Sequence, residues 1–264
     1  MAFSYLLPFL FVLLLSISSI SHGDDLIEKE CGSNFTNNDA LQANINTVIL
    51  DLVTNTTTTG FAYSTYGSGN DTVYGTAECR GDITGQDCSA CIINAGQEIR
   101  KSCTNTIEAR IWYQQCSFRY STTNFIGQAD TNLIGTWRSI GRTTDQKAFR
   151  KALEELFYVL ATATATAAAG ESRKFGWGQI EIHNLTITEA SAVYGMAQCT
   201  WDLEESPCFS CLGAAMNSIK EERDGSYIIL KSCAIRYEVS PFLFLNAAPN
   251  YADINTRNII FGNI

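Results

Sequence analysis

Two stretches of the chain share one cysteine spacing, and cysteine side chains can ligate a metal, exchange disulfides or form structural bridges. Residues 74–91 read YGTAECRGDITGQDCSAC, and residues 194–211 read YGMAQCTWDLEESPCFSC. Both follow the pattern Y-G-x-A-x-C-x8-C-x2-C. The repeated trio therefore poses a question about chemistry, and the compartment of the protein decides between the three answers.

The first 23 residues predict secretion. They contain an apolar run over residues 6–15 and end in Ser-His-Gly, which is typical of a signal peptide cleaved near Gly23. The run is shorter than the ~20 apolar residues that span a bilayer. Residues 241–245 form the most apolar later stretch, which is shorter still. We expect a secreted chain without a membrane span, located in an oxidising extracellular space.

Bridges are the interpretation that this compartment favours. Zinc would use the thiolates of C-x2-C pairs, and a redox site would need a free pair at a helix start. Each half of the chain instead has an even number of cysteines, and a third cysteine lies nine positions upstream of each C-x2-C as a bridging partner. All ten cysteines are therefore expected to be oxidised: Cys31, Cys79, Cys88, Cys91, Cys103 and Cys116 in the first half, and Cys199, Cys208, Cys211 and Cys233 in the second.

One pair follows from comparing the two halves. The second half lacks counterparts of Cys31 and Cys103, which we align with the neighbourhoods of Phe149 and of residues 220–223. Because these two cysteines are absent together and an even number of cysteines remains in the second half, we expect a Cys31–Cys103 bridge in the first. The other four cysteines of the first half admit three pairings, of which Cys88–Cys91 within one helix is disfavoured by geometry.

The elements around each trio repeat as well. Apolar residues of one helical face precede each Tyr-Gly, over residues 41–52 and 153–160, and capping residues stand before both helices. A second helix contains each C-x2-C, and aromatic and β-branched runs follow over residues 109–120 and 227–239. The order predicts an α+β fold in two tandem domains, residues 24–126 and 140–246, after a signal peptide at 1–23 and before a C-terminal tail at 247–264.

Composition argues against several functions. The net charge of −9 makes nucleic acid and anionic membranes poor partners. His183 is the one histidine left after signal cleavage, and no nucleophile is placed near it. The chain has no glycine-rich phosphate loop. We expect a non-enzyme with no cofactor and no metal.

With its secretion signal, the repeated C-x8-C-x2-C resembles the ginkbilobin-like (stress-antifungal) domain of plant cysteine-rich repeat secretory proteins, across essentially the whole mature chain. The resemblance implies that each domain packs two helices on a five-stranded antiparallel sheet. It also implies the bridges Cys31–Cys103, Cys79–Cys88, Cys91–Cys116, Cys199–Cys208 and Cys211–Cys233.

The resemblance also implies a mannose site made of an Asn, an Arg and a Glu. In the first domain these positions hold Gly32, Arg110 and Ser121, and in the second domain Tyr227 and Glu238 hold the last two. Arg110 and Glu238 are thus candidates in two incomplete sites. We expect this type of mannose binding to be absent or very weak, unless the two half-sites meet between the domains.

Two functional hypotheses follow. One is a binding protein of stress or defence responses that acts through an extracellular protein partner or a cell-wall carbohydrate. The alternative is a mannose-type antifungal lectin. N-glycosylation is expected at the sequons, which begin at Asn34, Asn55, Asn70 and Asn184.

Overall fold

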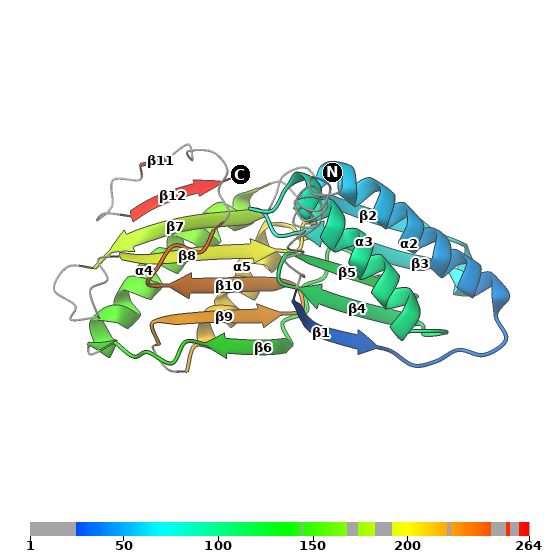
Figure 1. Cartoon of the computed structure of the whole chain (residues 1–264), viewed down its shortest axis with the longest axis horizontal. Helices are drawn as coiled ribbons and strands as arrows, with labels where there is room; N and C mark the ends of the chain where they lie inside the picture. The colour runs from blue at the N-terminus through cyan, green and yellow to red at the C-terminus, as the bar shows by residue number, and fades with distance from the viewer. Residues whose placement is uncertain are drawn as a thin grey trace, which may run out of the picture.

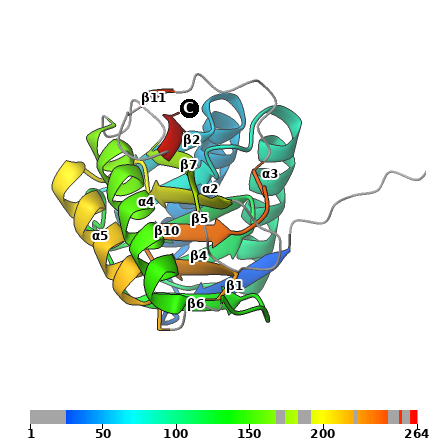
Figure 2. The ribbon, with the colours of Figure 1, turned by 90° about the vertical axis from the view of Figure 1, so that its left-hand side faces the viewer.

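The structure is a computed structural model that describes residues 25–143, 145–167, 174–182, 192–220, 223–243, 252–253 and 259–263, the last two ranges as backbone only. The predicted signal peptide, His183 and Asn184 lie outside these residues. Figures 1 and 2 show two domains joined end to end, each with one layer of helices and one sheet. Helices α2 and α3 lie on one side of the long axis, and α4 and α5 lie on the other.

The first domain is an antiparallel sheet with both of its α-helices on one face. Its elements are β1 (Leu26–Cys31), α2 (Asp39–Thr59), β2 (Phe61–Tyr66), the 3-10 turn η1 (Gly69–Asp71), β3 (Val73–Cys79), α3 (Gly85–Ser102), β4 (Glu108–Tyr113) and β5 (Cys116–Ser121). The five strands run in the order β1-β4-β5-β3-β2. The predicted five-stranded fold is confirmed here.

The second domain repeats this order and adds two strands. Its elements are β6 (Leu133–Arg138), α4 (Gln146–Thr166), β7 (Phe175–Glu181), β8 (Ala192–Cys199), α5 (Glu205–Asn217), β9 (Gly225–Leu230), β10 (Cys233–Glu238), β11 (Ala252–Asp253) and β12 (Ile259–Asn263). Strands β6, β9, β10, β8 and β7 match the first sheet, and β12 and β11 extend it beyond β7. Residues 247–264, which the sequence suggested were a polar tail, therefore contribute two strands to the sheet.

β6 lies before the start that the sequence predicted for the second domain, residue 140. It is the counterpart of β1: Cys31 pairs with Ala109 across the first sheet, and Arg138 pairs with Ser226 across the second. The structural counterpart of Cys31 is thus Arg138 and not the neighbourhood of Phe149. The sequence did not predict β6, because Gly135 and a register shift interrupt the alternating pattern of the strand.

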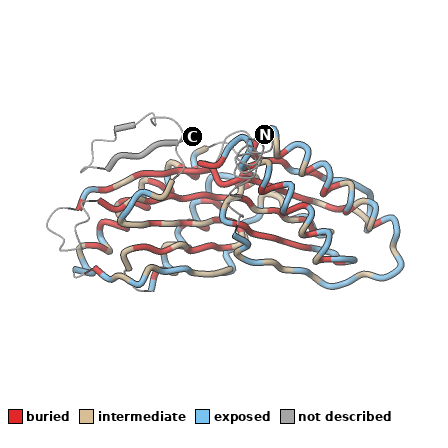
Figure 3. Tube along the Cα trace, in the orientation of Figure 1, coloured by how far each residue is buried: buried red, intermediate tan, exposed pale blue. Residues whose placement is uncertain are grey.

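The Tyr-Gly leader has a packing reason. A Cβ atom at Gly75 of β3 would lie 2.6 Å from Val48 and 2.7 Å from Leu52 of α2. At Gly195 of β8 it would lie 2.9 Å from Leu156 of α4. The glycine lets the first helix of each domain lie directly on the sheet. Figure 3 shows the resulting buried residues along the strands and on the inner sides of the helices.

The cysteine trio has a bridging function. Cys88 and Cys91 lie three residues apart on α3 and bond to Cys79 on β3 and Cys116 on β5, which are direct partners across the sheet. The trio of the second domain repeats this arrangement with Cys199–Cys208 and Cys211–Cys233. Cys31–Cys103 is the fifth bridge. These are the pairs that the resemblance implies.

Candidate functional site

The two domains meet through buried polar contacts. Gln198 of β8 accepts a hydrogen bond from the Gly81 N–H at 3.1 Å and donates one to the Cys79 carbonyl at 3.3 Å. Glu78 of β3 accepts a hydrogen bond from the Trp201 N–H at 3.0 Å. These backbone and side-chain contacts favour one orientation of the domains, because any other orientation would break all three hydrogen bonds.

Apolar contacts and the linker strengthen this junction. The rings of Phe61 and Trp201 stack with centroids 5.1 Å apart, one from each domain. In the linker, the Gly127 N–H donates to Asp202 at 2.7 Å and the Asp130 N–H donates to Ser232 at 2.9 Å. The two repeats therefore form one unit.

Glu78 is the unusual group of the interface. Its carboxyl is buried, with Ser117 donating to Oε1 at 3.3 Å and the Trp201 N–H donating to Oε2. Burial, followed by the negative charge of Asp202, raises the pKa of Glu78 to about 8. The neighbouring Arg80 is engaged by Asp82, with Nε–Oδ1 at 2.6 Å. Glu78 is accordingly neutral over the acidic range.

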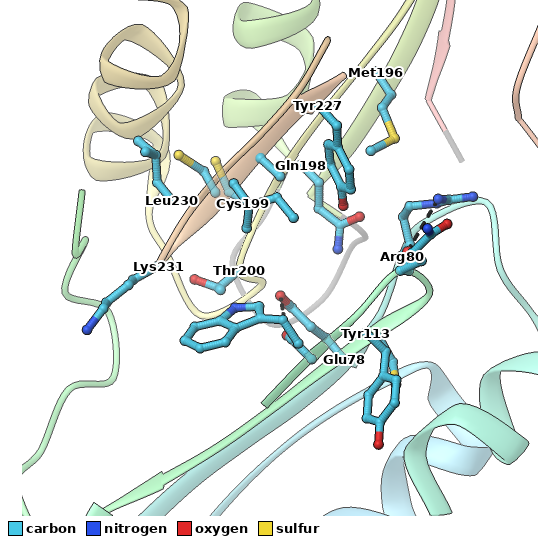
Figure 4. A pocket seen from close by; sticks show the side chains of 17 residues that line it. Glu78, Arg80, Tyr113, Met196, Gln198, Cys199, Thr200, Tyr227, Leu230 and Lys231 are labelled. Carbon is cyan, nitrogen blue, oxygen red and sulfur yellow. Dashed lines mark hydrogen bonds between the residues drawn. The ribbon is translucent and has the colours of Figure 1, made fainter. Parts of the chain in front are cut away.

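The cavity beside Glu78 is small. It measures about 60 Å³ and lies between the two sheets (Figure 4), with Tyr113, Gln198 and Tyr227 among its lining residues. That volume holds a few water molecules but no sugar ring. The buried carboxyl therefore serves the junction of the domains.

Arg110, the candidate sugar residue of the first domain, is covered by the linker. Its side chain is 7% exposed and forms an ion pair with Asp130 at 3.4 Å. It is paired across β4 and β5 with Arg119, whose guanidinium lies 3.5 Å above the ring of Phe125. Burial lowers the pKa of Arg110, which reflects the cost of holding this charge away from water. A sugar cannot reach the guanidinium without displacing the linker.

The other two positions of the first domain offer little to a sugar. A Cβ atom at Gly32 would lie 2.4 Å from Cγ of Glu108, so the side chain of Glu108 takes the space of the missing Asn. Ser121 is buried, and its hydroxyl accepts a hydrogen bond from the Thr123 N–H at 3.1 Å. This half-site is filled by the protein itself.

Glu238, the second candidate, lies in a different place. Arg236 donates to its Oε1 from Nε and Nη2, both at 3.1 Å. Burial raises the pKa of Glu238, and the charge of Arg236 opposes the shift. Glu238 lines an open groove with Asp25, Trp137 and Tyr227, and Arg110 does not line that groove. The structure does not bring Arg110 and Glu238 into one site.

Residues 28–123 and 136–240 match the family described as salt stress response/antifungal. The chain belongs to this family. Two consecutive matches cover the two repeats and most of the chain, as the repeated cysteine trio implied.

Members of the salt stress response/antifungal family resemble the chain over most of its length. It is 34% identical to cysteine-rich repeat secretory protein 55 of Arabidopsis thaliana over 88% of this chain and 89% of that protein. It is 30% identical to an antimicrobial ginkbilobin-2-like protein of Castanea crenata over 76% of this chain and 80% of that protein.

A solved structure of tandem domains has the same fold. The tandem DUF26 ectodomain of the Arabidopsis thaliana cysteine-rich receptor-like protein PDLP8 superposes with a TM-score of 0.67 at 24% identity, covering 83% of this chain and all of that chain. This likeness shows that the chain has the fold of tandem DUF26 domains. Among the helices of the described residues, none combines the length and apolarity that crossing a membrane requires.

The sequence did not predict the interface residues as functional. Glu78, Gln198 and Trp201 lie within or next to the repeated motif, where each also fits an ordinary strand or turn position. The one sequence signal was that Glu78 and Gln198 occupy the same position in the two repeats, directly before the first cysteine of each trio. In the described residues, no three His, Cys, Asp or Glu side chains cluster as metal ligands do.

Removal of the Arg110 side chain should leave mannose titrations unchanged. Because the linker covers the guanidinium, neither the wild type nor Arg110→Ala is expected to release measurable heat with millimolar mannose in calorimetry. Asp130→Asn, which weakens the linker contact without removing Arg110, is the matched control. Clear binding to the wild type that disappears in Arg110→Ala would contradict this expectation.

Glycosylation should be visible in the mass of plant-expressed protein. Asn34, Asn55 and Asn70 are exposed, Asn55 on α2 and Asn70 in η1. Asn184 lies outside the described residues, so the structure bears on three sequons only. We expect glycosidase treatment to lower the mass, and Asn→Gln at each exposed sequon to remove one glycan. A mass unchanged by the enzyme would contradict the prediction.

Proposed function

We propose that the chain is a secreted, non-enzymatic binding protein of the plant extracellular space that acts in stress or defence responses. The observation that carries the proposal is the locked junction of the two repeats. It holds surface groups of both repeats in one fixed arrangement. Preorganised surfaces bind with less loss of conformational freedom, so rigid joining of two domains favours recognition.

The buried ionisable groups support a structural role over catalysis. Glu78 has the raised pKa that general acids show, but its oxygens accept hydrogen bonds from Ser117 and Trp201 beside a cavity of about 60 Å³. Arg80 and Asp82 neutralise each other. A substrate has no access to these groups, which is why we propose a non-enzyme.

The mannose-type lectin is the weaker alternative. It would need Arg110, which the linker covers, and the position of the missing Asn, which Glu108 fills. The proposed ligand is therefore a cell-wall carbohydrate or an extracellular protein bound by another surface.

Retention of wall components by the immobilised, glycosylated chain would test the proposal. Plant wall extract would be passed over the full-length protein, and retained carbohydrate and protein would be identified by mass spectrometry. The matched control is the same chain reduced and alkylated, which lacks the folded surface. Retention by the folded protein alone is the expected result, and equal retention by both forms would refute the proposal.

A further inference from the structure

We infer that pH controls the junction between the two repeats: it is closed while Glu78 carries a proton and opens when Glu78 ionises, and both repeats stay folded in the open form. This device goes beyond the proposed binding function, because it does not depend on which ligand the chain binds. Two features of the structure carry it. The junction buries a carboxyl next to another acidic group, and none of the five disulfides crosses it.

The second domain covers Glu78. Ala77 and Cys79, its neighbours on β3, belong to the core under α2 and α3, and side chains alternate along a strand, so Glu78 points away from the helices. On that side its Oε2 accepts the hydrogen bond from the Trp201 N–H, and Figure 4 shows the carboxyl directed toward the second domain. Separation of the domains would therefore return this carboxyl to water.

The groups that face Glu78 do not compensate a negative charge. Its hydrogen-bond donors are the Ser117 hydroxyl and the Trp201 N–H, which are both neutral, and the nearest charge that acts on it is that of Asp202. The basic groups around the junction are held by other partners, and two phenols line the cavity: Arg80 pairs with Asp82, Lys231 with Glu30 and Arg110 with Asp130, the Arg119 guanidinium lies over the Phe125 ring, and the phenols are Tyr113 and Tyr227. Within the described residues, ionisation of Glu78 thus places a second negative charge beside Asp202 without a counter-ion.

The direction of the pH effect follows from this environment. Burial and then the charge of Asp202 raise the pKa of Glu78 to about 8 in the closed junction, whereas the carboxyl of an open junction would have its ordinary value of 4.5. Between these values the closed form keeps a proton that the open form has released. The ratio of open to closed molecules should therefore rise about tenfold for each unit of pH in this range.

Opening requires less than unfolding because each repeat is held together by itself. All five bridges join cysteines of one domain, and the two large apolar cores each contain residues of one domain only. Across the junction stand the hydrogen bonds of Gln198 and Glu78 and the stack of Phe61 on Trp201. The linker, residues 122–132, keeps the separated domains together, so the junction can close again. Partial opening along such a boundary is common in proteins with separate cores.

Amide hydrogen exchange of the disulfide-intact chain between pH 5.5 and 8 tests the inference. The N–H groups of Gly81 and Trp201 are the reporters, because each donates a hydrogen bond across the junction. After correction for the intrinsic exchange rate, their protection should fall about tenfold for each pH unit. The amides of Ile111 and Ile235, in central strands of the two sheets, should stay at least about a hundredfold better protected at every pH, since both cores remain folded in the open form.

Three variants separate the proton of Glu78 from the packing of the junction. Glu78→Gln stays neutral and should show nearly constant protection of the Gly81 and Trp201 amides. Asp202→Asn removes the neighbouring charge, so the decline should end at a lower pH than in the wild type. Gln198→Ala is the matched control, because it weakens the junction without changing a titratable group. It should lower protection by the same factor at every pH and keep the slope of the wild type.

Near-ultraviolet circular dichroism should confirm that the variants are folded, and Asp202→Asn supplies the test if Glu78→Gln is not. Wild-type protection of Gly81 and Trp201 that does not change with pH would overturn the inference. The same holds for a decline that persists in Glu78→Gln or has an unchanged end point in Asp202→Asn. Junction amides as well protected as Ile111 and Ile235 would show that the junction opens only when the whole chain unfolds, which would also refute it.

Discussion

Replacement of Glu78 by glutamine should remove most of the loss of stability that the protein shows as pH rises from about 4.5 to 8. In the wild type the folded-state pKa of Glu78, about 8, is raised from an ordinary value of 4.5. Between these values the unfolded chain has released the proton that the folded chain keeps, so the free energy of unfolding falls as pH rises. The contribution is fully present below pH 4.5 and is lost by about pH 8.

The expected difference is large. At 1.36 kcal/mol for each pH unit between the two pKa values, the full loss amounts to roughly 5 kcal/mol. Glutamine mimics the protonated carboxyl, because its oxygen can accept from the Trp201 N–H while its amide donates to Ser117. The variant should therefore match the wild type at pH 4.5 and exceed its stability at pH 8.

Urea unfolding of the disulfide-intact chain from pH 4.5 to 8.5 measures both slopes. Glu98→Gln is the control, since Glu98 is a carboxylate of the first domain whose pKa is lowered by Ser102 and Lys29. That variant should keep the decline of the wild type. A wild-type stability that stays constant or rises over this range would show that Glu78 is ionised in the folded protein.

Loss of the Cys31–Cys103 bridge is the second change with a large expected effect. It closes a sequence separation of 72 residues, the longest of the five bridges. Loop-closure entropy gives about 4 kcal/mol for such a loop. We expect the double variant Cys31→Ala/Cys103→Ala to lose that much stability, with faster amide exchange in β1 and β4 and little change in α4 and α5.

The matched comparison is Cys79→Ala/Cys88→Ala, which opens a separation of only nine residues. The same relation gives about 2.5 kcal/mol for this loop. Denaturation of both variants, with hydrogen exchange followed by mass spectrometry, separates the two values. If removal of the short bridge costs as much as removal of the long one, loop entropy does not explain the stabilisation.

The absence of this bridge from the second domain has a structural counterpart. Arg142 and Arg223 form an isolated β-bridge there, as Asn34 and Thr106 do in the first domain. Arg223 also donates to the Ile140 carbonyl at 3.0 Å. Hydrogen bonds thus hold the segment that follows β6, where a covalent bond holds the end of β1.

The sequence by itself determined the repeat, the layers and one bridge. Local patterns suffice for these: apolar residues at helical spacing recur before each Tyr-Gly, and Asn38 and Asp145 cap α2 and α4 as their residue types predict. Cys31–Cys103 followed from counting, because a bridge that is lost must lose both partners. The remaining pairs came from the family resemblance.

Only the tertiary structure decided which candidate residues are accessible. Arg110 stands at a position that suggests sugar binding. The linker that covers it lies outside the repeated motif and contacts Arg110 through Asp130 and Arg119 through Phe125. β6 was missed because its pairing with β9 compensates for an interrupted strand pattern. β12 was missed because its apolar run is only three residues long and stands in an otherwise polar segment. Glu78 and Trp201 are 123 residues apart, and only the packing of two folded domains brings their atoms within 3.0 Å. Contacts of this kind depend on the relative placement of the domains, which no short-range pattern of residues encodes.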